Sequence, residues 1–63
     1  MAWWNKIDHG AQRWVFEQDR LAYHLMHAAY EADPDLQKQI INLMTDKQRD
    51  LARKAKDGSW KRC

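Results

Sequence analysis

Apolar residues recur along the chain at the three- and four-residue spacing of an amphipathic helix, and no stretch alternates between apolar and polar residues as a half-buried strand does. This pattern predicts two long helices, the first from about residue 4 or 8 to residue 31 and the second from about residue 34 to residue 57. The turn between them falls at residues 32–34. We therefore expect an all-α fold.

The expected turn carries a start signal for the second helix. The Asp33 carboxylate can cap the helix, Pro34 suits a first position that needs no backbone N–H, and Asp35 suits the positive end of the helix dipole. At the other end, Gly58 suits the left-handed conformation that terminates many helices, and Trp60 follows closely enough to fold back onto the first helix. These signals define both ends of the second helix.

Residues on either side of the turn mirror each other at heptad spacing. In an antiparallel hairpin, the positions facing each other would be Ala29/Gln37, Leu25/Ile41, Ala22/Met44, Gln18/Gln48, Val15/Leu51 and Ala11/Ala55. In length, two-helix layout and acidic turn the chain resembles the ROP-type RNA-binding hairpins, and this resemblance is one of topology alone. We predict that residues 1–63 form a single helical hairpin domain.

The chain is short for a self-sufficient core. Its 63 residues lie near the size at which buried apolar surface barely offsets the entropy lost on folding. Small domains gain further stability from disulfides, metal ions or a partner, and a chain with the single cysteine Cys63 cannot form an internal disulfide. We therefore expect the hairpin to form a homodimer, arranged as a four-helix bundle.

The first predicted helix is apolar around most of its circumference, whereas a core-facing stripe usually spans about 100°. A second copy, a different protein or the N-terminal segment folding back would have to cover the rest. Phe16, Tyr23 and Tyr30 recur every seven residues along one edge, with Met26 beside them. Aromatic rows are typical of interfaces, because they bury a large area at low entropic cost. The leading hypothesis is a non-enzymatic protein-binding module, such as a small regulator, an inhibitor or an engineered binder, that uses these four residues.

Two glutamines interrupt the expected apolar seam. Gln18 and Gln48 occupy the same predicted layer, where their amides could bond to each other. A competing register would leave both amides unpaired in the core, so the pair would select one alignment of the helices. We predict that this pair sets the register.

Charge is unevenly distributed about a net value of +2. Residues 1–46 carry four basic and seven acidic side chains, whereas residues 47–63 carry seven basic and two acidic ones. A basic end suits the dipole of the second helix, and it also offers an alternative function, the binding of nucleic acid by a hairpin dimer. The residues that would carry this function are Arg49, Arg53, Lys54, Lys56, Lys61 and Arg62.

A second alternative is a metal-binding helical assembly. His24, His27 and Glu31 lie three and four residues apart, on one face of the first helix. Imidazoles one turn apart with a carboxylate nearby can bind zinc or another divalent ion. One helix supplies at most these three ligands, so a solvated polar face is the simpler interpretation.

Other classes of function find little support in the sequence. Nothing resembles a phosphate-binding loop, a nucleophile with its base or a pair of buried carboxylates, so we expect neither an enzyme nor a cofactor. The four tryptophans should gather at the open end of the hairpin as an end-cap. No apolar run approaches the ~20 residues that span a bilayer, and residues 1–6 lack signal-peptide features, so we expect a cytoplasmic protein.

Overall fold

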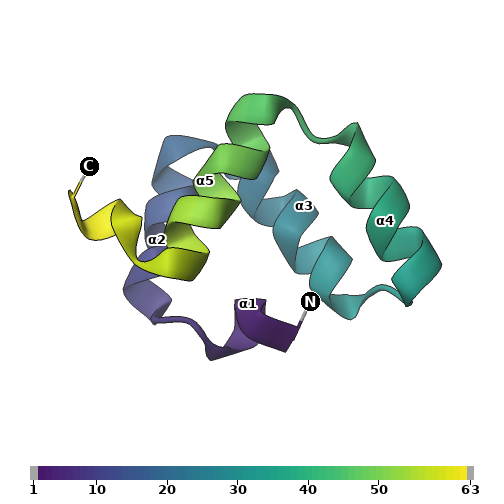
Figure 1. The fold of residues 1–63 in the computed structure, drawn as a ribbon, viewed down its shortest axis with the longest axis horizontal. Helices are drawn as coiled ribbons and strands as arrows, with labels where there is room; N and C mark the ends of the chain where they lie inside the picture. Colours follow the sequence, from purple (N-terminus) through teal and green to yellow (C-terminus); the bar gives the residue numbers. More distant parts are fainter. Residues whose placement is uncertain (1, 63) are drawn as a thin grey trace.

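A computed structural model describes residues 2–62, and Cys63, whose role the sequence leaves open, lies outside them. Every regular element in this range is a helix, which confirms the all-α fold (Figure 1). The elements are α1 (Ala2–Lys6), α2 (His9–Gln18), α3 (Arg20–Glu31), α4 (Pro34–Leu43), α5 (Asp46–Asp57) and a final 3₁₀ turn, η1 (Ser59–Arg62).

The first long helix expected from the sequence is broken at two aspartates. Asp8 accepts a hydrogen bond from the N–H of Gly10 at 2.8 Å and caps α2. Asp19 has an extended backbone, with φ −156° and ψ 103°, and its carboxylate accepts a hydrogen bond from the N–H of Ala22 at 3.1 Å. Each carboxylate satisfies a free N–H group of a new first turn. The prediction of one uninterrupted helix is therefore wrong here.

The second long helix is broken in the same way, between Leu43 and Asp46. Thr45 Oγ1 accepts a hydrogen bond from the backbone N–H of Gln48 at 3.1 Å, and the Gln48 side-chain oxygen accepts one from the N–H of Thr45 at 2.9 Å. This reciprocal capping box starts a new helix at little cost. Asp33, in contrast, caps α4 as predicted, through the N–H of Leu36 at 2.9 Å.

The helices pack in two antiparallel pairs in place of one long hairpin, with α3 on α4 and α2 on α5 (Figure 1). The mirrored positions Ala22/Met44, Val15/Leu51 and Ala11/Ala55 are all buried in one core. The two breaks meet where the Gln48 amide donates a hydrogen bond to the Asp19 carboxylate at 3.2 Å. Three of the six mirrored pairs are thus buried in one core, whereas the single long hairpin predicted from them is not observed.

α1 folds back against α3 and covers part of its wide apolar arc. The Trp4 side chain is 1% exposed and is the largest fully buried side chain of the described residues, followed by Met26 and Val15. Its ring lies 5.9 Å from that of Tyr23. Of the three covers that the sequence left open, the N-terminal segment therefore supplies one.

The tryptophans lie in two pairs. Trp3 and Trp4 pack edge to face at 6.1 Å, and Trp14 lies 6.5 Å from Trp60. Trp60 folds back onto α2, as predicted, where it lies so close that a Cβ on Gly10 would be 3.1 Å from its ring.

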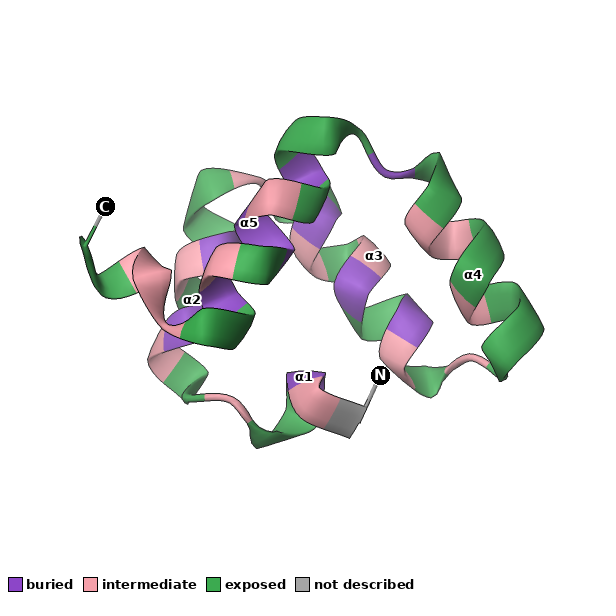
Figure 2. Ribbon diagram, viewed as in Figure 1, coloured by how far each residue is buried: buried purple, intermediate pink, exposed green. Residues whose placement is uncertain are grey.

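α4 contributes least to the core. None of its residues is buried, and Figure 2 shows it as half-buried or exposed along its length, in contrast to the buried bands of α3. Two of its apolar side chains are open to solvent, because Leu36 is 47% exposed and Leu43 is 77% exposed. One side of α4 is thus both apolar and uncovered.

Gly58 ends α5 in the left-handed conformation, with φ 85° and ψ −1°, as the sequence predicted. We expect Gly58→Ala to lower the free energy of unfolding by about 1 kcal/mol, because a Cβ strains this conformation. Gly58→Asn should cost less, since asparagine tolerates a positive φ. Urea unfolding followed by circular dichroism measures both, and equal losses for the two variants would contradict a conformational cause.

Candidate protein-binding surface

A connected group of rings lies on the outer side of α2 and α3. Phe16 packs edge to face on Tyr23, with ring centroids 5.3 Å apart and planes at 88°. Tyr23 stacks on His27 at 6.0 Å and contacts His24 at 5.5 Å. We call Phe16, Tyr23, His24 and His27 the aromatic surface. Phe16 is 36% exposed, Tyr23 is half-buried and both histidines are exposed, so the surface is open to a ligand.

The bend at Asp19 produces this arrangement. Residues seven apart on a straight helix are separated by about 10 Å along its axis. Phe16 and Tyr23 lie on different helices, and the bend between those helices brings their rings to 5.3 Å. Trp4 supports Tyr23 from the buried side, at 5.9 Å. The rings are therefore held by the fold and do not depend on a ligand for their position.

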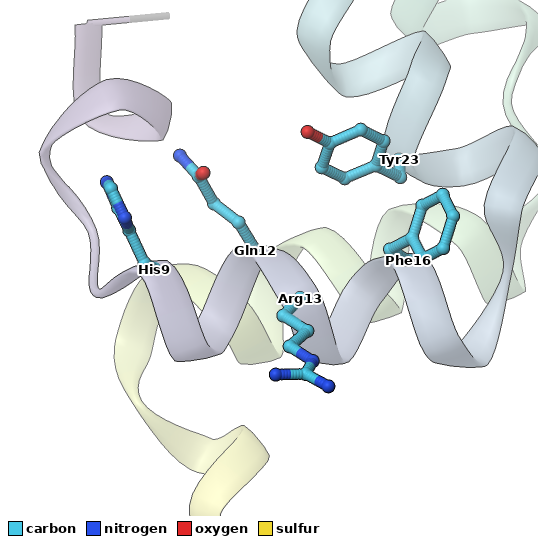
Figure 3. A pocket seen from close by; sticks show the side chains of 5 residues that line it. All are labelled: His9, Gln12, Arg13, Phe16 and Tyr23. Atoms are coloured by element: carbon cyan, nitrogen blue, oxygen red, sulfur yellow. The ribbon is translucent and has the colours of Figure 1, made fainter.

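An open depression of about 380 Å³ adjoins the aromatic surface, lined by His9, Gln12, Arg13, Phe16 and Tyr23 (Figure 3). Gln12 Nε2 donates a hydrogen bond to the Trp4 carbonyl at 2.7 Å, which joins α2 to α1. Arg13 Nε lies 3.2 Å from a Glu17 carboxylate oxygen, and its side chain points away from the rings in Figure 3. The depression thus offers an aromatic wall with polar groups at its edge.

Cations and carboxylates surround these rings. The Arg20 guanidinium lies 5.2 Å from the centroid of the Phe16 ring, a cation–π distance. His27 Nε2 lies 3.6 Å from a Glu31 carboxylate oxygen. Arg20 and Glu31 therefore lie at the exposed edge of the aromatic surface, beside Phe16 and His27.

Of the four residues predicted to form the contact row, the structure brings together only Phe16 and Tyr23. Met26 is 2% exposed and lies in the core one turn from Ala22 and Ala29, so its assignment as a contact residue is wrong. Tyr30 is half-buried and packs against the core, as Tyr23 also does, but among the described residues no ring contact joins it to Phe16 or Tyr23. His24 and His27, which the sequence suggested as metal ligands, instead complete the aromatic surface.

The predicted Gln18–Gln48 pair does not form. Gln18 is exposed at the end of α2, because the break at Asp19 turns this position away from the core. Gln48 is buried, 8% exposed, and its amide bonds to Asp19 and Thr45. Gln48 therefore bonds to Asp19, a partner that the sequence did not suggest, and its role in setting the register stays a prediction.

Arginines proposed for nucleic-acid binding already have carboxylate partners. Arg49 lies 2.9 Å from Asp46, and Arg53 lies 2.8 Å from Asp50 and 3.0 Å from Asp57. These hydrogen bonds lower the pKa of Asp50 and raise that of Arg53. These pairs are exposed and therefore weak, so they do not by themselves exclude contact with a phosphate, and the nucleic-acid function stays a prediction.

The remaining basic candidates make contacts of different kinds. Lys54 pairs with Asp50 at 3.1 Å, and the ammonium groups of Lys56 and Lys61 lie 5.5 and 5.7 Å from the centroids of indole rings. Arg62 is exposed at the end of η1. The set predicted for nucleic acid thus forms no uniform row of free cations.

The metal hypothesis receives no geometric support. Within residues 2–62, no group of three or more histidine, cysteine, aspartate or glutamate side chains is placed to hold a metal ion, so His24, His27 and Glu31 do not form the expected site.

No protein-family model, curated protein or solved structure matches this chain. None of the helices within residues 2–62 combines the length and the apolar character needed to cross a bilayer.

Proposed function

We propose that this chain is a non-enzymatic protein-binding module that contacts its partner through the aromatic surface, acting as a small regulator or inhibitor. The observation that carries the proposal is the linked set of partly exposed rings, with Phe16 and Tyr23 in edge-to-face contact at 5.3 Å. Aromatic side chains held rigidly at a surface contribute most to binding, because they bury a large area without losing much entropy.

The surface suits a partner with an apolar or aromatic anchor side chain. Such an anchor can pack against Phe16 and Tyr23 in the depression of about 380 Å³. Polar groups of the partner's backbone can reach His9 and Gln12 at its edge. The cations Arg13 and Arg20 already interact with Glu17 and with the Phe16 ring, which favours an apolar contact over the capture of an anion.

A selection from a phage-displayed random peptide library tests this proposal. We expect peptides selected on the wild-type chain to carry a large apolar anchor and to lose about tenfold or more in affinity for Phe16→Ala. Leu43→Gln is the matched control, because Leu43 is exposed on a different helix, and it should leave the affinity unchanged. If no peptide is enriched, or if the peptides keep their affinity for Phe16→Ala, the proposed binding surface is wrong.

Ionic strength separates this function from the nucleic-acid alternative. Apolar contacts respond little to salt, whereas binding of phosphates weakens steeply as salt concentration rises. We therefore expect a labelled RNA or DNA duplex to bind weakly, if at all, and Arg53→Glu to leave peptide binding intact. An electrophoretic shift of the duplex that Arg53→Glu abolishes and Tyr23→Ala leaves unchanged would instead favour nucleic acid.

A further inference from the structure

An apolar surface separate from the aromatic surface lies on α3 and α4. We call it the leucine face, and its residues are Leu21, Leu25, Ala28, Leu36, Ile40 and Leu43. Leu21 is 60% exposed, Leu36 47% and Leu43 77%. A chain of 63 residues rarely leaves several large apolar side chains open on one face unless something covers them.

Each helix contributes one stripe to this face. The three residues of each stripe are spaced at i, i+4 and i+7, so they lie on one side of their helix. Ala29 and Gln37, joined by a hydrogen bond of 3.1 Å, mark the line of contact between α3 and α4. Within each stripe, Leu25 on α3 and Ile40 on α4 are half-buried and lie next to this line of contact.

Both stripes lie on the same side of the α3–α4 pair. Met26 and Ile41 line one common depression, so they face the same side of the pair. Leu25 and Ile40 each precede them by one residue, a turn of about 100°. Viewed from one end, two antiparallel helices turn in opposite senses. The step from Met26 to Leu25 and the step from Ile41 to Ile40 therefore both cross the line of contact, and they place Leu25 and Ile40 on the side opposite the depression. The leucine face is therefore continuous across the two helices.

We propose that the leucine face binds a second copy of this chain, so that α3 and α4 of two copies form a four-helix bundle. No charged residue belongs to the face, and Gln39 and Asn42 lie at its α4 edge, although 32% of the chain is charged. Two such faces meet without bringing like charges together, whereas a charged partner finds no complementary group.

A second copy is also the partner that α4 requires. This helix has no buried residue and packs mainly on α3. A partner that covers its apolar side would stabilise it, provided that the partner is present whenever the chain is present. A second copy of the chain meets that condition. The dimer leaves Tyr23 free, because Leu25 and Tyr23 are two residues apart and point to roughly opposite sides of α3. His24 lies at the border of the leucine face, three residues after Leu21.

The size of the face determines how strong this dimer is. Two helices about 9 Å apart and about 15 Å long give a face whose pairing buries on the order of 600 Å² in total. Stable complexes usually bury about 1,200 Å² or more. We therefore expect a reversible dimer with a dissociation constant in the high micromolar range.

Sedimentation equilibrium between about 20 µM and 1 mM, with Cys63 kept reduced, tests the proposal. We expect the mass of the wild-type chain to rise from 7.6 kDa toward twice that value. Leu43→Gln should weaken dimerisation about tenfold or more, because it removes a large apolar side chain from the interface. Lys38→Gln, an exposed change on the opposite side of α4, should have no effect.

Three outcomes would overturn the proposal. One is a mass of 7.6 kDa throughout this range, and another is a dimer that Leu43→Gln leaves unchanged. The third is a dimer lost in Phe16→Ala but kept in Leu43→Gln, which would place self-association on the aromatic surface. Far-UV circular dichroism confirms that each variant is folded, and Leu21→Gln on α3 provides a second variant should Leu43→Gln lose helix.

Discussion

Replacing Trp4 with alanine is expected to lower the free energy of unfolding by about 3–5 kcal/mol, the usual cost of deleting a large buried aromatic side chain. Trp4 is 1% exposed, and it closes the core between α1 and α3. A domain of this length has a total stability of only about 3–9 kcal/mol. A large fraction of Trp4→Ala should therefore be unfolded at 25 °C, as urea titration by circular dichroism would show.

Trp4→Phe is the matched control for this prediction. The Trp4 Nε1 atom is buried and has no hydrogen-bond partner within residues 2–62, so replacing the indole by a phenyl ring removes an unsatisfied donor. Most of the apolar contact with Tyr23 remains. Trp4→Phe should thus cost less than half as much as Trp4→Ala. A loss below about 1 kcal/mol for Trp4→Ala would contradict the placement of α1 in the core.

Removal of the Asp19 carboxylate is expected to cost about 2–4 kcal/mol. Asp19→Ala loses the cap of α3, worth about 1 kcal/mol. It also leaves the buried Gln48 amide without its acceptor, at about 1–3 kcal/mol. Asp19→Asn keeps one oxygen, which can still accept from the N–H of Ala22, but its NH2 group replaces the oxygen that accepts from Gln48. It should therefore recover only the part due to the cap, about 1 kcal/mol. Equal losses in urea unfolding for the two variants would show that the cap on Ala22 contributes nothing, and a loss below about 1 kcal/mol for Asp19→Ala would contradict a contribution from the Gln48 contact.

The charge of Asp19 makes part of this contribution depend on pH. The N–H of Ala22 lowers the pKa of Asp19, and the side chain of Gln48 acts in the same direction. A carboxyl whose pKa is lower in the folded state stabilises the fold above its unfolded pKa, about 3.9, and that stabilisation is lost as pH falls through the folded value. We expect the unfolding free energy of the wild-type chain to fall more steeply below about pH 4 than that of Asp19→Asn.

Local signals in the sequence predicted several features well. Asp33 and Pro34 define the start of α4, and Gly58 defines the end of α5, because each acts on the backbone within a few residues of itself. Thr45 and Gln48 form a Thr-x-x-Gln capping box that is also visible in the sequence, so the start of α5 could have been predicted from it.

The break at Asp19 could not be predicted in the same way. An aspartate within an apolar periodic stretch is tolerated in a helix, and a cap is worth only about 1 kcal/mol. Here the amide of Gln48, 29 residues away in the sequence, adds to the local cap. Whether the helix breaks at Asp19 therefore depends on a tertiary contact. The aromatic surface depends on the same break, because the bend brings Phe16 onto Tyr23.

Met26 shows a second limit of the sequence pattern. A helix that is apolar around most of its circumference does not reveal which edge faces the core, because that depends on where the other helices pack. α3 is flanked by α1, α2, α4 and α5, and this arrangement buries Met26, leaves Tyr23 half-buried and leaves Phe16 of α2 36% exposed. The predicted row therefore included both core and surface residues.

The most direct test of binding through the aromatic surface is chemical-shift mapping of the ¹⁵N-labelled chain with a peptide from the library selection. We expect the largest shift changes at Phe16, Tyr23, His24 and His27, with small changes at Arg49 and Arg53. If the largest changes fall instead on the basic residues of α5, or are spread evenly over the chain, the aromatic surface is not the binding site.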